Sequence, residues 1–318
     1  MRACEAIWLI VIKNSNRYML VTEGITIMKF AAVLFVLLAS SCVKALLVTA
    51  ELKNNQRPFY VIGHMANSVS TMDLFLKDGA NAVELDVTFE SNGAAWWVFH
   101  GVPCDYFRVC HESTQLVDYL RAASSRNLSL IFLDLKCSRL SDKAKRFGGI
   151  DLARKITGHF WEKGAEEVNV VLSIPHTSDQ ALLEAFIEEM RAINESRMAK
   201  VSFDVSENPD LNAVFRMYRQ LNVTSAWQGD GVTNWFEPFR SFARVRQAID
   251  IRDRGDNVIK KVYRWTVDWK ARMRQLIYMG IDGVITNKPH RTVQVIQETK
   301  GARVARPKDS INELFLKE

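Results

Sequence analysis

The chain has 318 residues, of which 48% are hydrophobic and 25% charged, with a formal net charge of +6. This composition is ordinary for a globular protein and excludes a chain that is disordered throughout. Residues 1–45 hold five basic and two acidic side chains and so carry +3 of this charge, which leaves a formal net charge of +3 for the rest of the chain. Without a Lys/Arg-rich run, that excess argues against a nucleic acid partner and leaves a membrane surface open.

The first pattern along the chain is a leader. Residues 30–41 form an apolar run that is too short to span a membrane but suits the hydrophobic part of a secretory signal peptide. Cleavage is expected near Ala45 or Ala50, and Met28 is a natural initiator, which would make the preceding residues an upstream extension. We therefore expect a secreted protein with a leader over residues 1–45 and one domain over residues 51–318.

Eight β-like segments follow, each an apolar run bounded by turn residues. They are Tyr60 to Gly63, Ala82 to Phe89, Leu130 to Leu135, Val168 to Ile174, Val201 to Val205, Thr224 to Trp227, Lys261 to Val267 and Gly283 to Ile285. Helical patterns lie between most of them, such as residues 151–161, 178–193, 212–220 and 271–279. This alternation predicts an α/β fold of the (βα)8 TIM barrel type in a single domain, with a doubly wound open sheet as the competing architecture.

Two short segments do not fit the alternation. Trp96 to His100 is expected to belong to a loop inserted after the second strand, over the active face of the barrel. Gly229-Asp230-Gly231 lacks the third glycine of a dinucleotide-binding loop and is interpreted as a turn after the sixth strand.

Three cysteines follow the leader. Cys104 and Cys110 flank a five-residue stretch that contains Asp105. Because secretion permits disulfides, this spacing favours a small clamped loop, with two free thiols as the alternative. Cys137 would then be left over and is expected to be buried or unreactive.

Acidic side chains occur on two of the predicted strands. Glu84 and Asp86 are two residues apart, so they share one strand face, and Asp134 and Lys136 form a similar pair on the next strand. Buried carboxylates need a compensating cation, and oxygen ligands are those that hard cations prefer. The pattern predicts a Mg²⁺ site.

Two histidines lie near the same strand ends. His64 ends the first strand, where barrel enzymes keep their catalytic groups, and His100 lies in the inserted loop. A core histidine is the alternative for His64 alone. Two imidazoles beside a metal site suit general acid and base catalysis at a phosphodiester.

These residues resemble the spider-venom sphingomyelinase D or phospholipase D toxins, which are relatives of glycerophosphodiester phosphodiesterases. The resemblance covers most of the chain after the leader and rests on the order of many short motifs. Those motifs are Gly63-His64-Met65, Gly79-Ala80-Asn81, Glu84-Leu85-Asp86-Val87, His100-Gly101-Val102-Pro103-Cys104-Asp105, Asp134-Leu135-Lys136, Val171-Leu172-Ser173-Ile174-Pro175, Trp227-Gln228, Asp230-Gly231-Val232-Thr233-Asn234, Lys261-Val262-Tyr263, Trp265-Thr266-Val267-Asp268 and Thr286-Asn287.

The resemblance implies a role for each matching residue. It implies that Glu84, Asp86 and Asp134 hold Mg²⁺, and that His64 and His100 form the acid/base pair. The remaining implied roles are substrate phosphate binding by Lys136, substrate pocket positions for Trp265, Asp268 and Asn287, and support of a catalytic histidine by Asp105. Packing is the alternative for Trp265, and strand-end hydrogen bonding is the alternative for Asp268 and Asn287.

The chain departs from the family at informative positions. Tyr106 and Trp235 stand where many members carry a second disulfide, so the chain resembles the single-bridge subgroup, which implies a bridge between Cys104 and Cys110. Arg264 stands where the toxins usually have a tyrosine and is expected to add a cation beside the phosphate pocket. The segment Ala302 to Phe315 follows only loosely the family's C-terminal segment, which helps close the base of the barrel.

The implied function is a phospholipase D that releases choline from sphingomyelin and lysophospholipids and forms a cyclic ceramide phosphate. A glycerophosphodiester phosphodiesterase and a non-catalytic lipid-binding protein are the alternatives. Trp235, Phe236 and Phe239 could insert into a membrane interface or pack within their loop. The chain is expected to be monomeric, with possible N-glycosylation sites at Asn127, Asn194 and Asn222.

Overall fold

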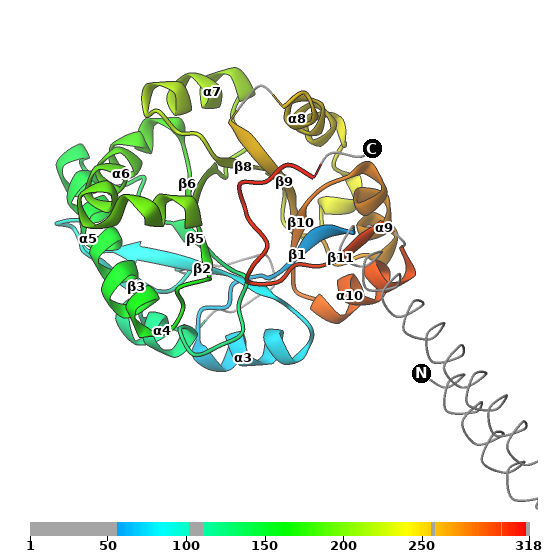
Figure 1. The fold of residues 1–318 in the computed structure, drawn as a ribbon, viewed down its shortest axis with the longest axis horizontal. Coiled ribbons are helices and arrows are strands. Elements are labelled where there is room, and N and C mark those ends of the chain that lie inside the picture. The colour runs from blue at the N-terminus through cyan, green and yellow to red at the C-terminus, as the bar shows by residue number, and fades with distance from the viewer. Residues whose placement is uncertain (1–55, 102–110, 256–257, 300, 316–318) are drawn as a thin grey trace, which may run out of the picture. The chain divides into compact units, whose positions relative to one another are not determined.

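The three-dimensional structure is a computed structural model that describes residues 56–101, 111–255, 258–299 and 301–315. The chain divides into two compact units, Met1–Gln56 and Arg57–Glu318, and all elements named below belong to the second unit. Helix and strand labels are those of Figure 1.

Eight parallel strands form a closed barrel (Figure 1). The barrel closes because β1 pairs in parallel with both β2 and β10. This closure confirms the predicted (βα)8 barrel and excludes the open doubly wound sheet. The barrel strands are β1 (Arg57–Gly63), β2 (Ala82–Phe89), β5 (Leu130–Leu135), β6 (Asn169–Ile174), β7 (Val201–Val205), β8 (Ala226–Gly231), β9 (Ile259–Trp265) and β10 (Gly283–Thr286).

The strand positions follow from burial. A barrel strand is covered by helices outside and by side chains inside, so it reads as a continuous apolar run. Every residue of β6, β7 and β10 is buried, and all eight predicted strands are present with ends shifted by a few residues.

Gly229-Asp230-Gly231 forms the end of β8 and not a turn, which corrects the sequence-based interpretation. The two glycines make room for large side chains of the neighbouring strand β9. A Cβ atom at Gly229 would lie 2.5 Å from the hydroxyl of Tyr263, and one at Gly231 would lie 2.5 Å from the ring of Trp265. Only glycine lets these two rings lie across the strand.

Among the residues that the structure describes, eight α-helices are assigned, and they surround the barrel (Figure 1). Side-chain oxygens of Ser68, Ser141 and Asp210 accept backbone hydrogen bonds at the starts of α3, α5 and α7. The cap at Ser141 explains why α5 begins well before the predicted helix at residue 151. The helices are α3 (Val69–Lys77), α4 (Leu116–Ala123), α5 (Asp142–His159), α6 (Gln180–Asn194), α7 (Leu211–Gln220), α8 (Ala243–Asp253), α9 (Lys270–Met279) and α10 (Pro289–Glu298).

The predicted insertion after the second strand is present. Strands β3 (Ala95–Val98) and β4 (Thr114–Gln115) add to the edge of β2 in antiparallel fashion. The insertion starts from the carboxyl end of β2, and it therefore lies beside the face where TIM barrels carry their active sites.

The middle of the barrel is filled by aromatic rings. The ring of Trp227 lies 5.1 Å from that of Tyr60, 6.2 Å from that of Phe132 and 5.9 Å from that of Tyr263, measured between centroids. Contacts at these distances are favourable tilted or edge-on packing. This aromatic layer separates the two ends of the barrel interior.

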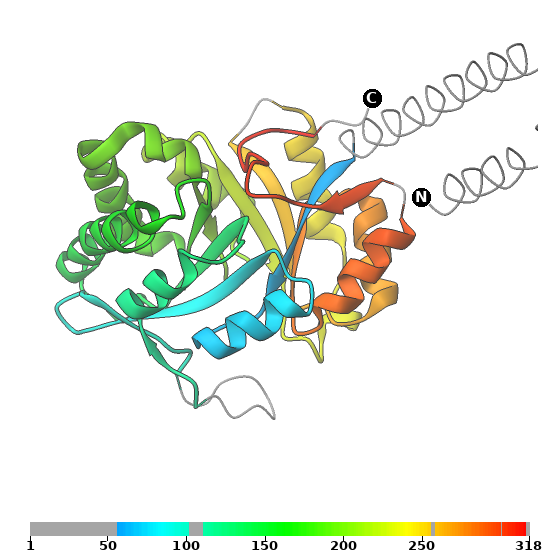
Figure 2. The same ribbon diagram turned by 60° about the horizontal axis from the view of Figure 1, so that its bottom comes forward.

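The C-terminal segment closes the end of the barrel where the strands begin (Figure 2). Strand β11 (Ala302–Val304) pairs with the start of β1, and the side chain of Ile311 is fully buried beneath the aromatic layer. The backbone carbonyl of Ala305 accepts hydrogen bonds from the side chains of Asn81 and Ser129. Although its sequence follows the family's C-terminal segment only loosely, this segment lies at the base of the barrel and closes it.

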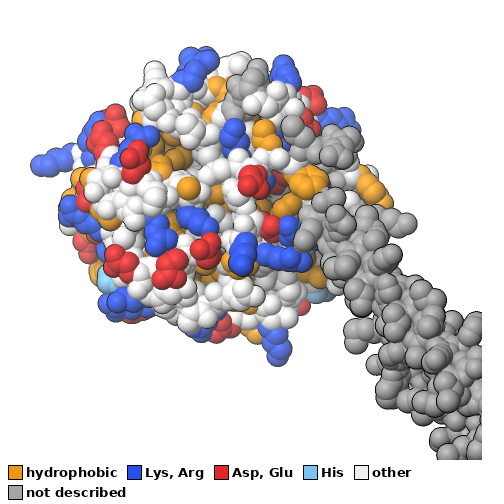
Figure 3. All heavy atoms as spheres, viewed as in Figure 1, with side chains coloured by type: hydrophobic (Ala, Val, Ile, Leu, Met, Phe, Trp, Pro, Cys, Tyr) orange, Lys and Arg blue, Asp and Glu red, His pale blue; other side chains and the backbone are white. Residues whose placement is uncertain are grey.

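The face that this segment crosses carries charged side chains of both signs, intermixed over the surface (Figure 3). No helix within the described part of the chain is long and apolar enough to span a membrane.

Candidate active site

A cavity of about 330 Å³ opens at the carboxyl ends of the barrel strands. It lies above the aromatic layer, with Phe132 and Tyr263 in its floor. Seven side chains singled out from the sequence line it, and they come from four barrel strands and the inserted loop. They are His64, Glu84, Asp86, His100, Asp134, Lys136 and Trp265.

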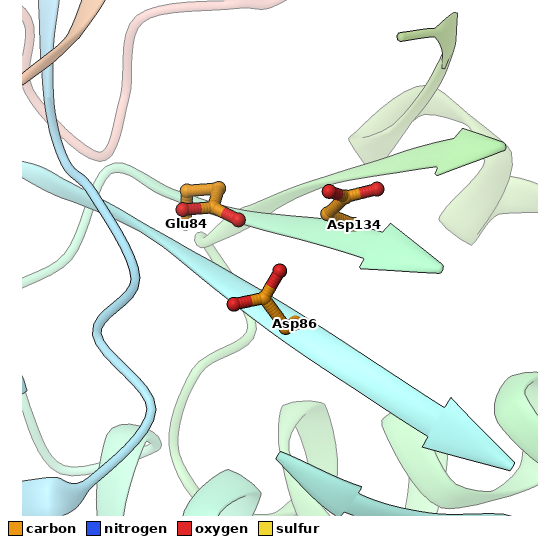
Figure 4. A group of neighbouring side chains, drawn as sticks. All are labelled: Glu84, Asp86 and Asp134. Atoms are coloured by element: carbon orange, nitrogen blue, oxygen red, sulfur yellow. The ribbon is translucent and has the colours of Figure 1, made fainter. Parts of the chain in front are cut away.

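Three carboxylates meet in this cavity, from the neighbouring strands β2 and β5 (Figure 4). Glu84 and Asp86 project from the same face of β2, and Asp86 is paired in register with Asp134 of β5. One oxygen of each carboxylate lies within 4.8 Å of the others. Such a group of hard oxygen donors could hold one divalent metal ion.

The carboxylates are crowded and largely removed from water. Burial raises the pKa of Glu84 well above its usual range, and the neighbouring carboxylates of Asp86 and Asp134 raise it further. Burial also raises the pKa of Asp86, but the ammonium of Lys136 and the imidazole of His100 lower it, with a net decrease. Crowded anions of this kind are stable only with a compensating cation.

Backbone and amide groups hold two of the carboxylates in place. The backbone N–H of Met65 donates to Oε2 of Glu84 at 2.6 Å, and Nδ2 of Asn67 donates to Oδ2 of Asp86 at 2.7 Å. Donors that orient ligand oxygens are typical of metal sites in proteins. These two contacts leave one oxygen of each carboxylate for other partners.

Lys136 lies between two of the acids. Its ammonium is 2.8 Å from Oδ1 of Asp86 and 2.7 Å from Oδ2 of Asp134. Burial lowers the pKa of Lys136, but Asp134 and Asp86 raise it, so it ends above its usual value. Three carboxylates and one ammonium leave two negative charges, which a single divalent cation would balance.

His64 is held from behind by a chain of hydrogen bonds. Its Nδ1 lies 3.1 Å from Oδ1 of Asn287, and Nδ2 of Asn287 donates to Oδ2 of Asp268 at 3.0 Å. Asp268 and Asn287 do not line the cavity but lie behind the imidazole. Of the predicted pocket residues, these two therefore act on the site through His64.

His100 lines the cavity from the inserted loop. Its Nδ1 is buried and has no hydrogen-bond partner within the described ranges. Asp105, which was expected to support a histidine, lies outside the described residues, as do Cys104 and Cys110 of the expected disulfide. Cys137 is a buried free cysteine, as the sequence led us to expect.

Two cavity groups, Tyr263 and Ser173, were missed from the sequence, as was Asp204, which binds both of them without lining the cavity. The Tyr263 hydroxyl and the Ser173 hydroxyl donate to Oδ2 of Asp204 at 2.9 and 2.8 Å. Burial raises the pKa of Asp204 to about 6 although these hydrogen bonds lower it. The available signal was strand alternation, since Tyr263 lies two residues before Trp265 and must share its face.

Arg264 does not lie beside the phosphate-binding side chains, and that expectation is wrong. Because Tyr263 and Trp265 face the cavity, the residue between them points away from it. The Arg264 side chain is fully buried outside the barrel, where its guanidinium pairs with Asp230 and, at 3.1 Å, with Glu237. It anchors the segment after β8 to the sheet.

That segment exposes the aromatic side chains that were singled out from the sequence. Trp235, Phe236 and Phe239 are 61%, 54% and 86% exposed. More than half of the surface of each side chain is therefore exposed to solvent. Trp269, at the start of α9, is 58% exposed, and the two segments touch because Arg272 of α9 binds Glu237.

Comparison with solved structures supports the fold. The chain resembles a glycerophosphodiester phosphodiesterase from Parabacteroides distasonis with a TM-score of 0.52 and 16% identity, over 76% of this chain and 98% of that one. A phosphodiesterase from Oleispira antarctica, solved with the product sn-glycerol-3-phosphate, gives a TM-score of 0.51 and 16% identity. The likeness covers 75% of this chain and 96% of that one. At this identity the likeness establishes a shared barrel.

Comparison of sequences identifies the family. The chain is 39% identical to dermonecrotic toxin SPH from Ixodes scapularis over 83% of this chain and 78% of that protein. It is 37% identical to dermonecrotic toxin Hl-PLD1 from Hemiscorpius lepturus over 81% of this chain and 85% of that protein. The model of the family described as dermonecrotic toxin SPH matches residues 54–312. This match covers every barrel strand and every cavity residue named above, and the chain therefore belongs to the dermonecrotic toxin SPH family.

Proposed function

We propose that this protein is a secreted, Mg²⁺-dependent phospholipase D that releases choline from sphingomyelin and lysophospholipids. One observation carries the proposal: three carboxylates, one ammonium and two imidazoles surround a single cavity at the carboxyl face of a barrel. This set can neutralise a phosphodiester and move protons on both sides of it. A purely lipid-binding protein has no use for two imidazoles at a metal site.

Glu84, Asp86 and Asp134 would hold the metal, and their buried, crowded oxygens fit a hard divalent cation. When bound, such a cation polarises the phosphate oxygens and neutralises their charge. Lys136, at the edge of the same group, would contact a further phosphate oxygen. The phosphate would thus be fixed between the acidic cluster and the histidines.

The histidines would move the protons. One imidazole accepts the proton of the attacking hydroxyl, a new oxygen–phosphorus bond forms, and the bond from phosphorus to the choline oxygen breaks. The other imidazole donates its proton to that leaving oxygen. When the attacking group is the lipid's own hydroxyl, the product is a cyclic phosphate, and when it is water, the product is a linear monoester.

A substrate comparison tests the proposed chemistry. We expect choline release from sphingomyelin and from lysophosphatidylcholine, with a cyclic phosphate seen by phosphorus NMR, and much slower release from glycerophosphocholine. A preference for glycerophosphocholine would favour the alternative, a phosphodiesterase for small glycerophosphodiesters. A product spectrum with only linear monoester would contradict the cyclisation.

The exposed aromatic loop suits a protein that meets its substrate in a membrane. Replacing Trp235, Phe236 and Phe239 together by serine removes three exposed rings, each of which gains free energy on entering the interface. We expect binding to sphingomyelin vesicles to weaken by at least about 10-fold. Turnover of a soluble short-chain lysophospholipid should be unchanged.

A control for this prediction replaces Leu74 of α3 and Phe147 of α5 by serine, since their side chains are 64% and 46% exposed on helices that do not carry the loop's contacts. Vesicle binding by the control should match that of the parent. Equal loss of vesicle binding and of soluble turnover in the triple variant would reject membrane insertion by the loop.

Secretion, a monomeric state, a disulfide between Cys104 and Cys110, and glycosylation belong to the same proposal. Secretion would permit both the disulfide and the glycans. Asn127, Asn194 and Asn222 are all exposed, as glycan attachment requires.

A further inference from the structure

Positive charge is concentrated in one part of the domain. Residues 235–274 hold eleven basic and five acidic side chains, whereas the chain after residue 45 has an excess of only three positive charges. The remaining residues of the domain therefore carry a net negative charge. The basic stretch runs from the exposed aromatic loop through α8 and β9 into α9. Such an asymmetry is a property of a surface, and it bears on what that surface binds.

The acidic side chains beside the aromatic loop point into the protein. Asp230, Glu237 and Asp268 are 1%, 0% and 8% exposed. Their carboxylates bind side chains and backbone groups of the barrel and its loops. Little of their negative charge is therefore presented to solvent at this place.

Three basic side chains in the same region are presented to solvent. Arg246 and Lys288 are exposed and Lys270 is partly exposed, and none of the three forms an ion pair within the described ranges. Lys270 binds the neutral side chain of Gln294, and the guanidinium of Arg246 lies 5.9 Å from the ring centroid of Phe242. We call Arg246, Lys270 and Lys288 the cationic rim.

Contacts between segments place the rim beside the aromatic loop. Arg272 of α9 pairs with Glu237 of the loop at 3.2 Å, and Nδ2 of Asn234 donates to Asp268, just before α9, at 3.0 Å. Nη1 of Arg291 in α10 donates to the carbonyl of Asp268, also at 3.0 Å. The starts of α9 and α10 are thereby joined to the loop.

The start of α8 belongs to the same surface. The guanidinium of Arg272 lies 3.7 Å from the ring centroid of Phe242, which precedes α8. The first turns of α8, α9 and α10 contain no acidic residue, and each contains at least one arginine or lysine. Positive charge at a helix start opposes the helix dipole, so helix stability does not account for these cations.

The rim lies on the face of the barrel where the cavity opens. Helices α8, α9 and α10 each follow the carboxyl end of a barrel strand and succeed one another around the barrel (Figure 1). Exposed aromatic rings lie at the same face, on the loop after β8 and at Trp269 before α9. An acidic protein would complement only the cations, whereas an anionic bilayer would engage both the cations and the rings.

We propose that the cationic rim and the exposed rings beside it form a docking surface for a bilayer that contains anionic lipids. The rings would enter the interface, and the rim would bind the negative headgroups around them. These lipids are distinct from the proposed substrates, which are zwitterionic. The inference rests on the proposed function, since docking serves an enzyme whose substrate lies in a membrane.

Vesicle sedimentation tests the proposal, with the full chain and the triple variant Arg246→Gln, Lys270→Gln and Lys288→Gln. The vesicles are phosphatidylcholine with or without phosphatidylserine, and they hold no sphingomyelin. The parent should bind the phosphatidylserine vesicles at least about 10-fold more tightly, because each basic side chain near an anionic surface changes affinity about 5-fold. The triple variant should lose this gain and bind phosphatidylcholine vesicles as the parent does.

The matched control removes the same charge from the opposite end of the barrel. Lys77 ends α3, Lys163 follows α5, Lys308 lies in the C-terminal segment, and all three are exposed. Their joint replacement by glutamine should keep the gain from phosphatidylserine. Equal losses in the two triple variants would assign the effect to net charge and overturn the docking surface.

Two further outcomes would also overturn the proposal. One is a parent that binds both kinds of vesicle equally. The other is binding to soluble polyglutamate as tight as to phosphatidylserine vesicles, which would assign the rim to an acidic protein. Turnover of a soluble short-chain lysophosphatidylcholine separates this inference from the proposed function. The rim variant should keep that turnover, and a parent that docks on phosphatidylserine but releases no choline would reject the function and leave the docking surface in place.

Discussion

Replacing His64 by alanine is expected to lower kcat for choline release from sphingomyelin by a factor of about 10² to 10⁴, the range for loss of a general acid or base. His64 lines the cavity beside the acidic cluster, and its Nδ1 is already bound to Asn287. Its other ring nitrogen is therefore the one that can exchange a proton with substrate. Since binding of the phosphate depends on other groups, KM should change little.

The same loss is expected for His100→Ala, and the double variant should lose little more than either single one. Two residues that act in one proton-transfer sequence are not additive, because removing either one already stops the step. His290→Ala is the control, since the His290 side chain is 54% exposed, does not line the cavity and binds Asp78 at 2.8 Å. A His64→Ala variant that keeps more than about a tenth of parental kcat would remove His64 from the mechanism.

Replacing Arg264 by methionine is expected to destabilise the fold by about 3–5 kcal/mol, as when one member of a buried ion pair is removed. Arg264, Asp230 and Glu237 have side chains that are at most 1% exposed. The variant would leave Asp230 with Arg240 and Arg244, and Glu237 with Arg272, all of which are partly exposed. The free energy of unfolding should fall because the carboxylates of Asp230 and Glu237 would stay buried after losing one cationic partner.

Urea unfolding of the parent and the variant measures this loss. Arg154→Met provides the comparison, because Arg154 pairs with Glu189 at 2.8 Å while its own side chain is 67% exposed. An exposed pair contributes less than about 1 kcal/mol. Equal destabilisation by the two substitutions would show that Arg264 is not a buried anchor. If Arg264→Met instead lost phosphate binding at unchanged stability, Arg264 would have the role predicted from the sequence, that of a cation beside the phosphate pocket.

The barrel was predictable because its physical signal is local. Strands buried on both faces are mostly apolar, so the Leu-Ile-Phe-Leu run of β5 and the Val-Val-Leu run of β6 stand out in the sequence. Helix α8 was harder, since its buried positions Val245, Ala248 and Ile249 lie among arginines and acids. The end of β8 was missed because two glycines suggest a turn, whereas here they accommodate the rings of β9.

The cavity residues were predictable where a pattern within one strand placed them. Glu84 and Asp86 share a face by alternation, and the same rule, applied to β9, separates Tyr263 and Trp265 from Arg264. Applying it there would have identified Tyr263 and excluded Arg264. The contacts of Asp204 and Asn234 depend on how separate strands and loops meet, and no pattern within one segment encodes them.

Removal and return of the metal tests the central claim most directly, with choline release from sphingomyelin as the measurement. Chelation by EDTA should abolish turnover of the parent, and Mg²⁺ should restore it. Asp86→Asn should resist restoration at the same Mg²⁺ concentration, because one of the three cavity carboxylates is lost. Full turnover in the chelated parent would contradict an acidic cluster that works by holding a divalent cation.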